Sequence, residues 1–159
     1  MTPGRGGQIT SDGAHRLRAY AHAFIGRRIV GVRYRSAPGS RWPDVNSSDA
    51  IHEVDMEVVI VLDDASVVVI SWAMDGVLEG IGLDIEPEAK SIPRDDETDV
   101  TATPRWLHLS GQSVGEFGSA WHIPNEGCPE TLWAVRLSLN GGSVVAIGLD
   151  ELEDGTVQY

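Results

Sequence analysis

The side chains in this sequence that could hold an anionic ligand are two arginines on one predicted strand. Arg33 and Arg35 stand two residues apart in a stretch of alternating apolar and polar residues, so they share one face. Two guanidinium groups on one face could bind the carboxylate or phosphate of a ligand. Asp55 and Glu57 also share a face of a predicted strand, and ion pairs with the arginines follow if the two strands pair. We favour this structural pairing over ligand binding.

Trp42 and Trp121 are the candidate anchors of a binding site, and His122 stands beside the second. Trp42 precedes Pro43 in a polar segment, and Trp121 is followed by His122 and Pro124, so both tryptophans are predicted on loops. Tryptophans on loops frequently anchor interfaces and line ligand pockets. They also cap the ends of sheets, and the sequence leaves both interpretations open.

Metal, cofactor and thiol chemistry have less support. His52, Glu53 and Asp55 are potential metal ligands, but in a strand His52 points to the face opposite the other two. The single cysteine, Cys128, excludes an intramolecular disulfide, and the acidic residues around it oppose the formation of a reactive thiolate. We therefore expect no bound metal, no cofactor and no catalytic residue. Enzymatic activity stays open, but the sequence favours a protein that is not an enzyme.

The charges are divided unevenly along the chain. Residues 1–42 carry eight arginines and one acid, which gives 8 − 1 = +7. Residues 43–159 carry four bases and 23 acids, which gives 4 − 23 = −19, and the sum is the chain's net charge of −12. Residues 43–159 are acidic enough to repel the phosphates of nucleic acid, so nucleic acid is not expected as a partner. A basic protein is the expected partner. Such a charge also keeps a protein soluble without any partner.

One helix is predicted near the N-terminus, at residues 12–25. Its apolar residues recur at helical spacing and form a single stripe, made of Leu17, Tyr20, Ala21 and Phe24. Gly26 follows as a helix-ending residue, because glycine readily adopts the left-handed conformation found there.

After Gly26 the apolar residues recur at every second position, which is typical of strands. Residues 54–62 and 67–73 are predicted to form one hairpin, and residues 132–139 and 143–149 a second one through Asn140-Gly141-Gly142. The two hairpins align at a constant offset of 77 residues. This indicates a duplicated strand–hairpin unit, although any two valine-rich hairpins resemble each other.

These elements predict an α+β fold that is mainly antiparallel β. The helix packs on a curved or two-layer sheet of about six to nine strands. Residues 1–9 are expected to form a disordered tail and residues 10–159 a single domain, because each half has only roughly 55 to 60 residues, a marginal size for independent folding. Residues 84–105 hold three prolines and many acids, and are predicted to form a mobile acidic loop.

The expected location is the cytoplasm, without membrane contact. The N-terminus has no apolar stretch typical of a signal peptide. The longest apolar runs, at residues 58–62 and 67–70, are far shorter than the roughly 20 residues that cross a membrane.

Three functions follow from these observations. In size and charge alone, the chain resembles small acidic proteins that neutralise a basic partner, such as bacterial immunity proteins, and this likeness covers no motif. It implies an acidic module that binds a basic protein. The alternatives are a small-molecule-binding protein or cofactor-free enzyme with a tryptophan-lined pocket in a curved sheet, and a structural subunit of a homo-oligomer.

Overall fold

The computed structural model describes residues 9–37, 42, 52, 54, 57–75, 78–87, 96–123 and 126–148. Most of the expected N-terminal tail therefore lies outside the described residues. Its last residue, Ile9, does not belong to a tail, because it is buried in the core and its backbone is bonded on both sides. Its N–H donates to the carbonyl of Ile81, and its carbonyl accepts from the N–H of Leu132. Apolar burial and these two bonds hold the chain there.

The predicted N-terminal helix is present in two parts. It begins as the 3-10 helix η1 (Ser11–Arg16) and continues as α1 (Leu17–Phe24). Leu17 and Phe24 are buried and Tyr20 is half-buried, so the predicted apolar stripe faces the interior. After the helix, Gly26 adopts a φ of 82°, the left-handed conformation that glycine allows.

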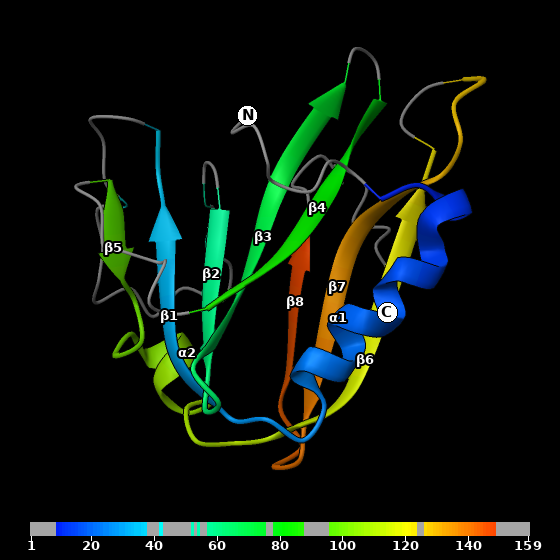
Figure 1. Cartoon of the computed structure of the whole chain (residues 1–159). Coiled ribbons are helices and arrows are strands. Elements are labelled where there is room, and N and C mark those ends of the chain that lie inside the picture. The colour runs from blue at the N-terminus through cyan, green and yellow to red at the C-terminus, as the bar shows by residue number, and fades with distance from the viewer. Residues whose placement is uncertain are drawn as a thin grey trace.

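Two antiparallel sheets make up most of the described chain, which confirms the predicted α+β class (Figure 1). The five-stranded sheet has the order β4-β3-β2-β1-β5 and consists of β1 (Ile29–Arg35), β2 (Glu57–Leu62), β3 (Ser66–Asp75), β4 (Leu78–Pro87) and β5 (Glu97–Asp99). The three-stranded sheet has the order β6-β7-β8 and consists of β6 (Val114–His122), β7 (Thr131–Leu139) and β8 (Val144–Gly148).

Both predicted hairpins are confirmed. β2 and β3 pair through a turn at residues 63–65, where Ala65 adopts a positive φ of 67°. β7 and β8 pair through residues 140–143, where Gly142 has a φ of 91°. β1 lies beside the first hairpin and β6 beside the second, so each sheet contains a strand–hairpin unit. Its origin by duplication stays a prediction.

The two sheets share one hydrophobic core, to which both contribute buried side chains. Figure 1 shows α1 alongside β6 and β7, while α2 (Pro104–Leu107) lies near one end of β1. Tyr20 on α1 donates a hydrogen bond of 2.8 Å to the carbonyl of Leu83 on β4, so the helix links the edges of both sheets. Trp106 on α2 is buried in the same core. Among the described residues, no helix is long and apolar enough to span a membrane.

The segment predicted as a mobile loop, residues 84–105, contains regular structure at both ends. β4 extends to Pro87, β5 occupies Glu97–Asp99, and α2 begins at Pro104. β5 had no signal in the sequence because this strand is stabilised by pairing with β1, which lies more than 60 residues earlier in the chain, and charge and proline content do not reveal such a pairing. Residues 88–95 lie outside the described residues, and the mobility of the segment stays a prediction.

Candidate functional site

Four side chains meet beside β1 and combine aromatic surface with hydrogen-bonding groups. We call them the aromatic–histidine cluster: Tyr34, Trp42, His52 and Trp106. Tyr34 reaches the cluster because the inward residues of β1 alternate with outward ones, and Val32 and Tyr34 face the core. Trp106 is placed by α2, which begins at Pro104, a residue suited to the first helical turn.

A chain of hydrogen bonds runs through this cluster. The indole N–H of Trp106 donates to the hydroxyl of Tyr34, whose oxygen lies 2.9 Å from Nδ1 of His52. An indole N–H can only donate, so the tyrosine oxygen accepts at that bond. The tautomer of the imidazole determines which group donates in the bond between Tyr34 and His52.

Burial keeps Tyr34 in its neutral form. The residue is 2% exposed, and loss of hydration raises the pKa of its hydroxyl to about 12, although the hydrogen bond from Trp106 and the charge of Arg105 lower it. A phenol with this pKa does not act as an acid or base near neutral pH. Its role in the cluster is to hold the orientation of His52 and Trp106.

Trp42 forms a wall of the cluster. Its ring lies 5.2 Å from that of Tyr34, edge to face, and 4.8 Å from the imidazole of His52. Its backbone carbonyl accepts a hydrogen bond of 3.4 Å from Thr98, the central residue of β5. The residue predicted as a loop anchor is thus half-buried and packed against the core.

Arg33 and Arg35 point to the opposite face of β1 and are engaged with carboxylates there. Arg35 donates 2.8 Å bonds to Glu57 on β2 and to Glu97 on β5, and Arg33 lies 3.3 Å from Glu97. The predicted pairing of the arginines with Glu57 is therefore present for Arg35, while Asp55 lies outside the described residues. The ion pairs of Glu97 with the two arginines were not predicted from the sequence.

This ion-pair network is buried. The side chains of Arg35 and Glu97 are each 3% exposed, and that of Glu57 is 9% exposed. Burial alone lowers the pKa of Arg35, but the bonds to the two carboxylates outweigh it and raise the pKa above its ordinary value. The geometry favours a structural role for this network over the binding of an anionic ligand.

Trp121 and His122 lie at the end of β6 and face opposite sides of the three-stranded sheet. Trp121 is half-buried against the core, and its indole N–H donates 3.1 Å to the hydroxyl of Ser119. His122 is exposed, and its ring lies 4.7 Å from that of Trp133 on β7. The two residues predicted as neighbours in a site therefore do not face a common space, and both belong to a strand.

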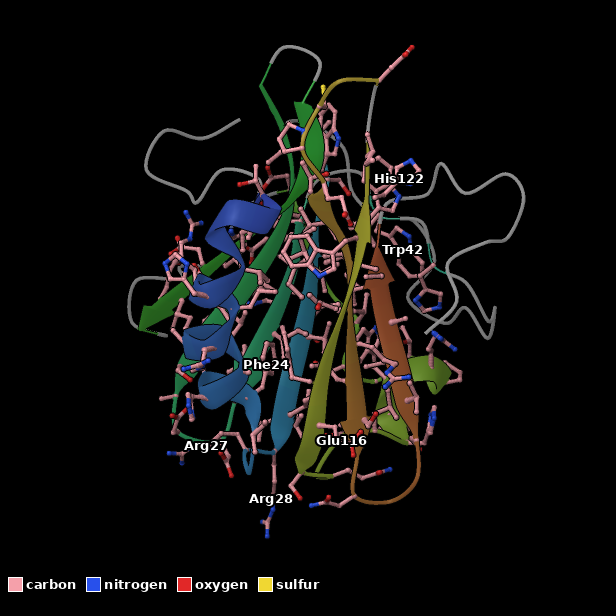
Figure 2. All side chains as sticks on the ribbon, turned by 90° about the vertical axis from the view of Figure 1, so that its right-hand side faces the viewer. Phe24, Arg27, Arg28, Trp42, Glu116 and His122 are labelled. Atoms are coloured by element: carbon pink, nitrogen blue, oxygen red, sulfur yellow. The ribbon has the colours of Figure 1, made fainter. Side chains whose placement is uncertain are left out.

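The exposed charges of the described chain are separated by sign. The exposed arginines all lie on or directly next to α1: Arg16, Arg18, Arg27 and Arg28. The exposed carboxylates all come later in the chain: Asp63, Asp64, Asp99, Glu116, Glu126 and Glu130. Arg27 approaches Asp64 at 3.5 Å, whereas Arg16, Arg18 and Arg28 form no ion pair within the described residues. Figure 2 shows Arg27 and Arg28 at the end of the molecule opposite His122.

Several of these contacts had no signal in the sequence. The pattern of β1 indicates that Tyr34 points inward, but nothing indicates its contacts with His52 and Trp106, which depend on chain segments 18 and 72 residues away. Among the described residues, no group of three or more His, Cys, Asp or Glu side chains is placed to hold a metal ion, and Glu53 and Asp55 lie outside them. Comparisons of the chain with protein-family models, with curated proteins and with solved structures find no match.

Proposed function

We propose that the protein is an acidic binding module whose partner is a basic protein. The observation that carries this proposal is the separation of exposed charge. Arg33 and Arg35 are engaged in the buried network, and the exposed arginines of the described residues are confined to the end of η1, α1 and the turn after it. Among the exposed carboxylates of the described residues, Asp64 has an exposed arginine, Arg27, within 4 Å. The other exposed carboxylates lie in parts of the described chain that hold no exposed arginine or lysine.

This charge distribution attracts a basic partner before contact. The attraction extends over about one Debye length, roughly 8 Å at physiological ionic strength. Steering of this kind raises the association rate and weakens steeply when salt is added. The partner would also need apolar contacts for affinity, because charges alone supply steering and specificity more than binding energy.

The connection between β6 and β7 offers both kinds of contact. Glu126 and Glu130 are exposed there, and Ile123 presents an apolar side chain that is 51% exposed. Trp121 lies half-buried at the base of the connection. We place the contact surface here because acidic and apolar groups coincide and the described residues of this connection include no arginine or lysine.

Capture of partners from the native host at low and high salt tests this function. We expect a basic protein that is recovered at low salt and lost at high salt. The double variant Glu126→Lys/Glu130→Lys should abolish recovery. A matched control, Asp63→Lys/Glu116→Lys, changes the net charge equally but lies elsewhere in the fold, so it should weaken capture only moderately.

The outcomes separate a local contact surface from general attraction. Equal losses in the two double variants would show that net charge, and not the β6–β7 connection, determines binding. Recovery of no basic protein at low salt would refute the proposed function.

A second function, the binding of a small molecule, is favoured by the aromatic–histidine cluster. Trp42 and His52 combine a stacking surface with an imidazole that is oriented by Tyr34. Groups of this kind bind planar ligands that also form hydrogen bonds. A compound that raises the melting temperature of the native chain but not of the Trp42→Ala variant, and that quenches tryptophan fluorescence, would support this function. A library without such a compound would argue against it.

A further inference from the structure

Among the residues that the structure describes, β8 is an edge strand without a partner on its outer side. Within the described part of the chain it pairs only with β7, and it ends the order β6-β7-β8. An open edge presents backbone N–H and C=O groups that can pair with another strand. The question is which groups face outward and what strand fits them.

The register of the hairpin identifies the outward groups. The N–H of Leu139 donates 2.8 Å to the carbonyl of Ser143, so this pair is hydrogen-bonded. In an antiparallel ladder, hydrogen-bonded and non-bonded pairs alternate along the strands. Val144, Ala146 and Gly148 therefore direct their backbone groups away from β7, and all of them are exposed to solvent.

In the described part of the chain, the other edges of the two sheets carry protective features that β8 lacks. β4 carries Asp84, Glu86 and Pro87, and β5 is only three residues long with two acids. β6 has two register shifts along its pairing with β7. Charges, proline, short length and irregular register are the usual devices that prevent edges from pairing. The sequence of β8, Val144–Gly148, has no charge and no proline, and its register with β7 is regular.

We propose that β8 pairs antiparallel with β8 of a second copy of this chain, about a two-fold axis at Ala146. The two three-stranded sheets then become one continuous sheet. Val144 of each copy lies opposite Gly148 of the other, so the 54% exposed valine side chain has room beside a residue without one. A strand that pairs with its own copy closes both open edges and stops further growth, which a partner with a second open edge would not do.

The dimer is weak and favoured by salt. One five-residue strand from each copy buries less surface than the roughly 1,200 Å² of a stable interface, so we expect a weak, transient dimer. Each copy carries a net charge of −12, and the repulsion between copies falls when salt screens it. Salt thus strengthens this dimer, whereas it weakens the binding of a basic partner. Because the two effects of salt are opposite, the dimer and the proposed function can be tested independently.

Sedimentation equilibrium over micromolar to millimolar concentrations of the full chain tests the dimer. We expect a monomer–dimer equilibrium that shifts to dimer at high salt. Ala146→Pro removes an N–H that faces outward and is not part of the ladder with β7, so it should leave the fold intact and abolish the dimer. Ala146→Thr keeps this N–H and should still dimerise.

Amide hydrogen exchange provides a readout at the residues themselves. The N–H groups of Val144, Ala146 and Gly148 should exchange rapidly in dilute protein and become protected when the concentration rises. The proposal is overturned if the native chain stays monomeric at millimolar concentration and high salt. It is equally overturned if Ala146→Pro dimerises like the native chain, or if these amides show no protection in a dimer.

Discussion

Replacement of Arg35 by methionine should destabilise the protein far more than replacement of Arg27. Arg35 donates 2.8 Å bonds to both Glu57 and Glu97, and all three side chains are at least nine-tenths buried. Arg35→Met keeps most of the side-chain volume but leaves two buried carboxylates without their main counter-charge. Loss of one partner from a buried ion pair costs about 3–5 kcal/mol. The exposed pair of Arg27 and Asp64, with side chains 47% and 34% exposed, is worth about 0–1 kcal/mol.

Urea denaturation followed by circular dichroism measures both losses in the same protein. The triple variant Arg35→Met/Glu57→Leu/Glu97→Leu also removes the two buried carboxylates that lose their counter-charge. It should recover much of the free energy of unfolding lost in Arg35→Met, because apolar replacements of a buried ion-pair network are often neutral or stabilising. The reasoning fails if Arg35→Met loses no more free energy of unfolding than Arg27→Met. It also fails if the triple variant is as unstable as the single one, since the buried carboxylates would then not be the cause.

Three further substitutions test other parts of the fold. Burial raises the pKa of Tyr34 from 10.0 to about 12, so the stability that this shift confers is complete below pH 10 and is lost as pH rises to 12. The free energy of unfolding of the native chain should therefore fall by up to about 3 kcal/mol over this range, as measured by urea titrations at a series of pH values. The Tyr34→Phe variant should lack this fall. Ala65 has a φ of 67°, so Ala65→Gly should raise the melting temperature by relieving up to about 1 kcal/mol of backbone strain. At Gly148, a Cβ would lie 2.8 Å from Cβ of Ala134 and 3.2 Å from the carbonyl oxygen of Trp133. Gly148→Val should therefore lower the free energy of unfolding by about 1–3 kcal/mol. An unchanged free energy of unfolding would contradict this close approach.

The elements that depend on neighbours in sequence could be predicted from the sequence. The helix is specified by residues four or fewer apart, and its stripe of Leu17, Tyr20 and Phe24 does face the interior. The hairpins are specified by strand alternation and by turn residues such as Gly142, which tolerates the positive φ found there. Each of these signals is complete within about a dozen residues, so no tertiary information is needed.

The candidate site depends instead on contacts that no local pattern encodes. Glu97 lies in an acidic segment that reads as a solvated loop, yet pairing of β5 with β1 brings it to Arg35, 62 residues away. That contact reverses the expected electrostatics, because a carboxylate counted as a surface charge is buried against an arginine considered for ligand binding. A sequence gives the sign of a charge but not its exposure. The exposure of each charge, on which the proposal of a basic partner rests, therefore depends on long-range strand pairing.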